Sequence, residues 1–313
     1  MTTSKASLTC ALPPFLSLVR RSIEAWESIP LPLALAPEEK TLATSMLERF
    51  TKLDNFLCRG PVMYWFFQKR EAFLSQKTIS KWSSDRLDDY ILLPSLKGYV
   101  TRSECFFLSH FWQKKDDPDP DGTYLRLNQQ SLRLQSWSYI WVDWTCIPQH
   151  PRTEQEDIYF KRALNTMSGI IRNSGFIWYY PPFQPRLWIL YEIAENDLTS
   201  DGDTLITPDN KEFKAHIQEM MDVGVRPTID KYGYSCSYDR DKEYLISWLE
   251  LLVLLRKLCV DTIDIRRILD GITWSHPRKM FTKTLTSLII VCPYEGTLEF
   301  FGKRHTFTPL PER

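Results

Sequence analysis

The chain has 313 residues, of which 43% are hydrophobic and 25% are charged. This composition is typical of globular proteins and excludes a disordered or collagen-like chain. The 39 Lys and Arg residues balance the 39 Asp and Glu residues, so the chain lacks the basic surplus of most nucleic-acid-binding proteins. The length favours two domains or one enlarged α/β domain, and nucleic acid is not an expected partner.

Glycine is scarce, which limits the kinds of nucleotide site that the chain can build. The sequence has 20 prolines but only 11 glycines, and neither G-x-G-x-x-G nor G-x-x-x-x-G-K-[ST] occurs. Their absence excludes the Rossmann dinucleotide fingerprint and the P-loop. The 11 tryptophans can line an aromatic pocket, although large core side chains are their more common use.

The seven cysteines are odd in number and widely spaced, and no C-x-x-C occurs. We therefore expect neither a disulfide framework nor a zinc site, and reduced thiols favour a cytoplasmic or nuclear location. The apolar stretch 6–19 is interrupted by Pro13 and Pro14 and is followed, not preceded, by two arginines. That order is wrong for a secretory signal. No apolar run reaches 18 residues, so we expect no membrane segment.

Residues 1–97 are predicted to form a helical N-terminal extension. Apolar residues at helical spacing predict a helix over 16–29, and Pro37 with Glu38 opens a second helix that runs to about residue 58. The proline-rich stretch 30–37 separates the two as a linker. The apolar segment 63–75 is interpreted as a packing element, with the wall of a pocket as the alternative.

Residues 98–197 carry the α/β pattern. Short apolar runs predict three strands, and amphipathic stretches between and after them predict helices. The strands fall within 99–111, 139–143 and 176–180, and the helices within 125–134, 154–171 and 186–197. Strands that alternate with helices predict a parallel sheet with crossover helices.

Residues 198–313 have a mixed pattern and are predicted to form an extension that packs on the core. We expect polar loops over 199–210 and 226–240, with a helix over 211–223 between them. The segment 241–258 is apolar on most faces and predicts a buried helix. A strand over 285–292 and a hairpin from Tyr294 complete the prediction.

The first candidate site residues follow the first predicted strand of the α/β segment. Ser109, His110 and Trp112 lie where that strand ends, and ligands bind beyond the carboxyl ends of parallel strands. Adjacent residues of a strand point to opposite faces, so Ser109 and His110 are poor partners for a catalytic pair. The acidic loop 116–122 imitates a calcium loop, but Asn128 stands where a bidentate carboxylate is needed. A solvated acidic turn is therefore expected, and no metal site is predicted.

A second group follows the next strand. Asp143 is the better functional candidate there, and it either holds a ribose hydroxyl or caps the following turn. Cys146 could act as a nucleophile, but a lone cysteine after an apolar strand is more often a small buried residue. Trp144 and Gln149 complete the group.

A third group lies on the helix predicted over 186–197. Trp188 and Glu192 are four residues apart and share one helix face, and Arg186 lies just upstream. An unpaired carboxylate among apolar residues is costly. Glu192 is therefore either paired with an arginine, such as Arg152 or Arg186, or retained for chemistry.

These segments, read together, resemble the fungal heterokaryon-incompatibility (HET) domain and the wider TIR-like group related to it. The strings that carry the resemblance are FLSHFW, DPDG, YIWVDWTCIPQ with HPRTEQE, and RLWILYE. The matching residues, in order, are Ser109, Trp112, Trp141, Asp143, Cys146, Gln149, Arg186, Trp188 and Glu192. The resemblance covers residues 98–197, about a third of the chain, and does not extend to the flanks.

The resemblance implies a flavodoxin-like sheet with helices on both faces. In TIR enzymes a glutamate on a W-x-x-x-E helix contacts the ribose of NAD and supports cleavage of the nicotinamide–ribose bond, and Glu192 occupies that position here. Trp112, Trp144 and Trp188 would stack on the bases or the nicotinamide. NAD would be a substrate, and no cofactor is implied.

Two other classes of function remain open at this point. One is a non-catalytic signalling module that self-associates into a homo-oligomer and triggers cell death. The other is a small-molecule biosynthetic enzyme on the same scaffold, for example in fungal secondary metabolism, because fold alone does not fix function.

Overall fold

The computed structural model describes residues 12–29, 37–202, 205–236, 238–258, 260–284 and 287–311. The predicted linker at 30–37, apart from Pro37, lies outside these residues, as do positions 6–11 of the apolar stretch 6–19 and two of the seven cysteines. No helix in the described ranges is long and apolar enough to cross a membrane.

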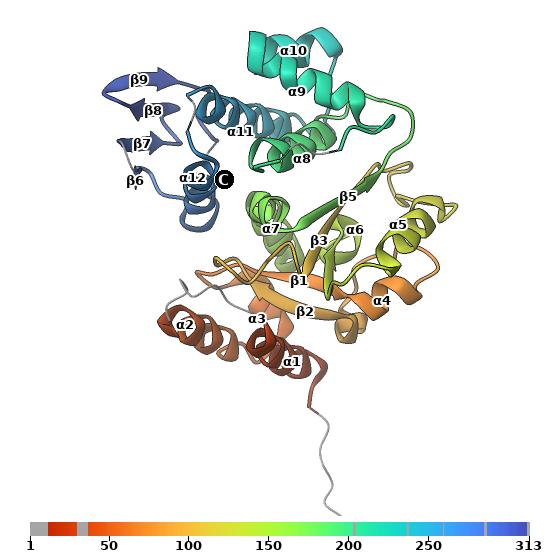
Figure 1. The fold of residues 1–313 in the computed structure, drawn as a ribbon. Helices are drawn as coiled ribbons and strands as arrows, with labels where there is room; N and C mark the ends of the chain where they lie inside the picture. The colour runs from red at the N-terminus through yellow and green to blue at the C-terminus, as the bar shows by residue number, and fades with distance from the viewer. Residues whose placement is uncertain are drawn as a thin grey trace, which may run out of the picture.

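The fold is α/β, as predicted, with its main sheet built by the first two thirds of the chain (Figure 1). The strands of this sheet are β1 (Tyr64–Lys69), β2 (Tyr90–Pro94), β3 (Cys105–His110), β4 (Tyr139–Trp141) and β5 (Gly175–Tyr179). The helices of this part are α1 (Pro14–Ser28), α2 (Pro37–Glu48), α3 (Leu53–Cys58), α4 (Arg70–Ser75), α5 (Thr123–Arg133), α6 (Asp143–Cys146), α7 (Glu154–Asn173) and α8 (Leu187–Leu198).

The main sheet is mixed rather than purely parallel. Its strand order is β2-β1-β4-β3-β5. Strand β3 runs parallel to β4 and β5, as predicted, but β1 runs antiparallel to both β2 and β4. The prediction of a wholly helical N-terminal extension is therefore wrong at β1 and β2, which join the same sheet as the α/β segment. Both strands are buried almost throughout, and such continuous apolar runs carry no alternation that separates strand from helix.

The two faces of the main sheet are covered by different segments. One face packs in a large apolar cluster with α1, α3, α7 and α8, and the other packs in a smaller cluster with α4 and α5. Local signals fix where the crossover elements begin. Thr153 and Glu156 form a capping box at the start of α7. Strand β5 begins at Gly175, where an added Cβ would lie 2.6 Å from the ring of Phe106.

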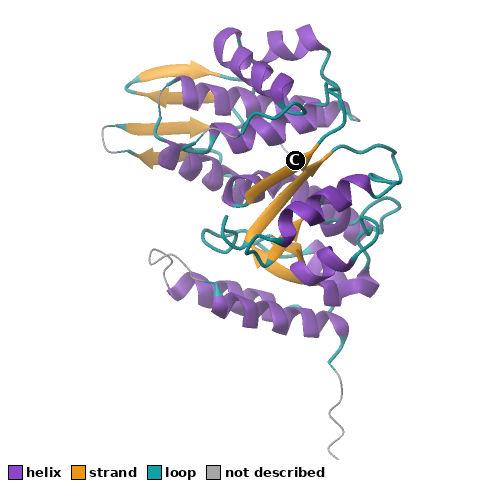
Figure 2. Ribbon diagram, turned by 45° about the vertical axis from the view of Figure 1, so that its right-hand side comes forward, coloured by secondary structure: helices purple, strands orange, loops and turns teal. Residues whose placement is uncertain are grey.

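The last third of the chain adds helices and a second sheet. The helices are α9 (Lys211–Val223), α10 (Val225–Tyr232), α11 (Asp239–Lys257) and α12 (Thr262–Ser275). The strands β6 (Met280–Lys283), β7 (Leu288–Cys292), β8 (Thr297–Phe300) and β9 (Lys303–Thr306) form an antiparallel sheet in chain order. Figure 2 shows helices lying between the two sheets.

Most of the predicted elements of this last third are confirmed, with three differences. The helix over 211–223, the buried helix near 241–258 and the final hairpin are present. The segment 226–240 is not all loop, because it contains most of α10. Helix α12 and strand β6 were not predicted.

In the N-terminal third, the helix expected from Pro37 to about residue 58 is divided into α2 and α3.

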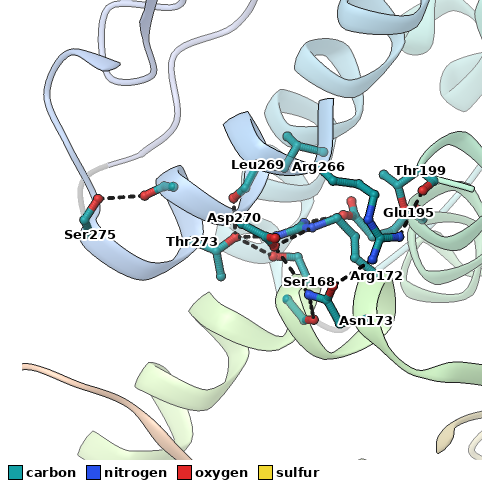
Figure 3. A network of polar contacts seen from close by, with 12 residues as sticks. Ser168, Arg172, Asn173, Glu195, Thr199, Arg266, Leu269, Asp270, Thr273 and Ser275 are labelled. Atoms are coloured by element: carbon teal, nitrogen blue, oxygen red, sulfur yellow. Dashed lines mark hydrogen bonds and ion pairs between the residues drawn. The ribbon is translucent and has the colours of Figure 1, made fainter. Parts of the chain in front are cut away.

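A buried ion-pair network joins the last third to the core (Figure 3). Arg172 of α7 lies between Glu195 of α8 and Asp270 of α12, and both Arg172 and Glu195 are fully buried. The Arg172 guanidinium donates to Asp270 Oδ1 at 2.8 and 3.0 Å, and the Trp248 indole of α11 donates to Glu195 Oε2 at 2.6 Å. Nearby carboxylates raise the pKa of Arg172 despite its burial. One cation thus ties α7, α8 and α12 together.

Candidate functional site

The candidate site lies beyond the carboxyl end of β3, where two polar side chains leave opposite faces of the sheet. Along β3, Cys105 and Phe107 pack in the larger apolar cluster and Leu108 in the smaller one. Ser109 therefore points to the side of α8, and His110 points to the other side. The expectation that these neighbours do not form a pair agrees with their separate hydrogen-bond partners.

Glu192 is the centre of the first polar group. The Ser109 hydroxyl donates to Glu192 Oε2, and the Tyr180 hydroxyl donates to Ser109 Oγ at 2.6 Å. Ser109 is fully buried, Tyr180 is 8% exposed, and Glu192 is partly buried. The carboxyl group is thus anchored on the protein side, in a residue that is itself not completely buried.

The surroundings of Glu192 favour its neutral form. Burial raises the pKa of Glu192 to about 8, the Ser109 hydrogen bond opposes this rise, and the negative charge of Asp143 adds to it. A glutamate with a pKa near the working pH is a frequent feature of catalytic sites, although structural groups also show it.

Asp143 is the centre of the second polar group. Its carboxylate is hydrogen-bonded by the His110 ring through Nε2, by the Trp112 indole at 2.9 Å and by the backbone N–H of Trp144. The Trp112 and Trp144 rings meet edge to face with centroids 5.0 Å apart. Trp112 is partly exposed, whereas Trp144 is buried. Both predicted alternatives for Asp143 therefore stay open, because it binds the turn that follows it and is still partly accessible.

Cys146 and Gln149 support the backbone of this turn. The Cys146 thiol is fully buried and hydrogen-bonds with the backbone of Ile140 and Val142, and burial raises its pKa to about 12. A thiol in this state is a poor nucleophile. The Gln149 amide donates to the carbonyl oxygens of Asp143 at 2.9 Å and Ile147 at 3.1 Å. Both side chains therefore hold the backbone of the turn that carries Asp143.

Arg186 and Trp188 lie at the start of α8, close to the end of β3. The Arg186 guanidinium is exposed and lies 5.0 Å from the centre of the Phe111 ring. Trp188 is partly buried and meets Tyr191 edge to face. In the part of the chain that the structure describes, Glu192 forms no ion pair with Arg186, or with Arg152, which bonds Asp157. Of the two alternatives for Glu192, pairing with either of these arginines is thus not found, and its hydrogen-bond partner is the Ser109 hydroxyl.

The acidic loop caps the start of the helix that follows it, α5. Asp119 is 2% exposed, and its carboxylate accepts hydrogen bonds from the backbone N–H groups of Tyr124 at 3.3 Å and Leu125 at 2.8 Å. It therefore binds the free N–H groups at the start of α5. Among the described residues no cluster of three or more His, Cys, Asp or Glu side chains could hold a metal ion.

Tyr180 is the site residue that the sequence analysis missed. It directly follows β5, which pairs with β3, and a polar residue at the carboxyl end of a parallel strand was the available signal. The crossover from β3 leads to β4 on one side, and the next crossover returns to β5 on the other. The ends of β3 and β5 therefore flank a topological switch point, where open α/β sheets bind ligands.

A separate groove of about 570 Å³ runs along the outer edge of β5. Phe106, Phe176 and Trp178 line it, together with residues of the loop before α9. It contains none of the predicted site residues, so the candidate site rests on the polar groups at the strand ends rather than on this groove.

The chain was compared with protein families, curated proteins and solved structures. It matches no protein-family model, and no curated protein or solved structure is significantly similar to it.

Proposed function

We propose that this chain cleaves the N-glycosidic bond of NAD or a related nucleotide and that Glu192 is the carboxyl group that acts on the ribose. The observation that carries the proposal is the position of Glu192 at a topological switch point, with Oε2 anchored by Ser109 and the residue only partly buried. The resemblance to TIR and HET domains supplies the reaction class. We also infer a flavodoxin-like core, because the parallel strands lie in the order β4-β3-β5, the second-first-third order of such sheets.

The proposed reaction uses the charge of the substrate. When the C1′–N1 bond breaks, its electron pair goes to the pyridinium nitrogen, so that nicotinamide leaves neutral. A positive charge develops at C1′, and a carboxylate beside it stabilises this oxocarbenium-like centre. Water then adds to C1′ and loses a proton. The products are ADP-ribose, nicotinamide and one proton.

The pKa of Glu192 determines when the reactive carboxylate is present. With a pKa of about 8, most of Glu192 is neutral at pH 7 in the free protein. A cationic pyridinium ring next to it would favour the ionised form, because an opposite charge lowers a carboxyl pKa. The carboxylate would thus be formed mainly when the substrate is bound.

The aromatic groups near the strand ends are available for stacking. Trp112 and Trp188 are each partly accessible, and rings of this kind stack on bases and on cationic rings. Trp144 lies behind Trp112 and supports it.

The test is release of nicotinamide from NAD, followed by chromatography, by the wild type, by Glu192→Gln and by Glu24→Gln. Glu24 is an exposed glutamate of α1, so it is a matched control for the same chemical change. We expect release by the wild type and the control and a loss of at least about 100-fold in Glu192→Gln, the usual scale for a group that stabilises transition-state charge. Equal rates in all three proteins, or no release from the wild type, would reject the proposal. Assembly that depends on concentration without turnover would then favour the signalling module, and a bound metabolite unrelated to nucleotides would favour the biosynthetic enzyme.

A further inference from the structure

Three side chains from three elements form one chain of hydrogen bonds. Tyr180 follows β5, Ser109 ends β3, and Glu192 lies on α8. Each hydroxyl has one proton to donate. Tyr180 donates its proton to Ser109 Oγ at 2.6 Å, and Ser109 donates its own to Glu192 Oε2. Each hydroxyl therefore donates its one proton, and the chain of hydrogen bonds ends at the carboxyl group of Glu192.

Tyr180 is itself held from a second side. Its backbone N–H donates to Asp209 Oδ2 at 3.0 Å, and Asp209 Oδ1 accepts from the Thr207 hydroxyl. The centres of the Tyr180 and Phe213 rings are 6.0 Å apart. The loop before α9 and the first turn of α9 thus fix the place from which the phenol reaches Ser109.

We propose that Tyr180 is a positioning residue of the site, whose hydroxyl orients Ser109 toward Glu192 Oε2 and so leaves Oε1 to face the substrate. The described part of the chain gives Glu192 Oε1 no hydrogen-bond partner. This inference rests on the proposed function for the identity of the substrate, but the hydrogen-bond chain exists without it.

Loss of the Tyr180 hydroxyl has a defined consequence for Glu192. Ser109 is fully buried, and Tyr180 is the one donor to its oxygen among the described residues. Without that donor, the Ser109 proton would be free to turn away from Glu192. The ionised carboxylate would then lose support, because a hydrogen bond to the charged form favours that form. The charge that acts on Glu192 is that of Asp143 of α6, and the charge of Asp209 acts on Tyr180. Neither changes in Tyr180→Phe.

The experiment is a carboxyl titration of the full chain by NMR, with glutamate labelled at Cδ with carbon-13. The Glu192 signal is assigned by its absence in Glu192→Gln. We expect the midpoint to rise by about 0.5 to 1 pH unit in Tyr180→Phe. Tyr191→Phe is the matched control, because Tyr191 is buried and adjacent to Glu192 in α8 but hydrogen-bonds with Ser168. Its midpoint should equal that of the wild type.

A second variant completes the test. Ser109→Ala should raise the midpoint at least as much as Tyr180→Phe does, and adding Tyr180→Phe to it should raise the midpoint no further. If one variant does not fold, the other still breaks the same chain of hydrogen bonds. An unmoved midpoint in Tyr180→Phe, or equal movement in Tyr191→Phe, would overturn the inference.

Failure of this inference is distinguishable from failure of the proposed function. The titration uses no NAD, so a moved midpoint together with no nicotinamide release would reject the proposed function and support the role of Tyr180 in holding Glu192. Nicotinamide release together with an unmoved midpoint would reject the role of Tyr180 alone.

Discussion

The effect of Glu192 on stability can be separated from any activity by replacing it with glutamine. Glutamine keeps the shape of the side chain and an oxygen that accepts from Ser109, but it does not titrate. In the wild type the pKa of Glu192 is raised from 4.5 to about 8. Between these values the unfolded chain loses its proton at Glu192 while the folded protein keeps it. Folding stability therefore falls as the pH rises through this window.

The size of the effect follows from the pKa. A rise from 4.5 to about 8 corresponds to at most about 5 kcal/mol, at about 1.4 kcal/mol for each tenfold change in the protonation equilibrium. Relaxation of the folded protein around the ionised carboxylate reduces this value. We expect the free energy of unfolding of Glu192→Gln, relative to that of the wild type, to rise by about 2 to 3 kcal/mol as the pH is raised from 4.5 to 9.

The assay is equilibrium urea unfolding at several pH values from 4.5 to 9, followed by tryptophan fluorescence and circular dichroism. Coincidence of the two signals tests whether unfolding is two-state, and the difference between variant and wild type cancels the titration of all other groups. Glu24→Gln, which removes an exposed carboxylate, provides the baseline. Parallel stability curves for Glu192→Gln and the wild type would refute the reasoning, because they would mean that Glu192 titrates alike in the folded and unfolded states.

Three further predictions concern single side chains. Asp143→Asn removes the negative charge that raises the pKa of Glu192, so the carboxyl titration of Glu192 should move to lower pH, and an unchanged midpoint would contradict this coupling. Arg172→Met leaves Glu195 buried without its cation and should cost about 3 to 5 kcal/mol in urea unfolding at pH 7, so a loss below about 1 kcal/mol would show that the network contributes little. Cys146→Ala should keep its rate of nicotinamide release within a few-fold of the wild type, since the thiol hydrogen-bonds with the backbone of Ile140 and Val142. Loss of activity in a stably folded variant would instead indicate that the thiol is a nucleophile.

The parts of the fold that the sequence predicted are those with a clear period or clear boundaries. The three parallel strands and the helices between them alternate regularly, and α7 begins at a capping box that includes Thr153. Strand β1 was missed because it is buried on both faces and shows no alternation. Helix α10 was missed because Gly224, Pro227 and Gly233 are typical of a loop, yet proline is tolerated in the first turn of a helix and the glycines stand at its two ends.

The site was predictable in its location but not in its partners. The rule that ligands bind at strand ends predicted that Ser109 and Asp143 lie at the same edge of the sheet. The i, i+4 spacing predicted that Trp188 and Glu192 lie on one face of a helix. Which group would bind Glu192 depended on the packing of α8 against β3. A residue type alone could not show that this partner is a hydroxyl supported by Tyr180 rather than an arginine.

The most direct test of the central claim is the pH dependence of kcat/KM for NAD between pH 6 and pH 9, with a blank without protein at each pH. Since the carboxylate form of Glu192 is the form proposed to act and its pKa in the free protein is about 8, kcat/KM should rise about tenfold per pH unit at low pH and level off above about pH 8. A wild-type protein that releases no nicotinamide at any of these pH values, or that releases it at a rate independent of pH, would contradict the account.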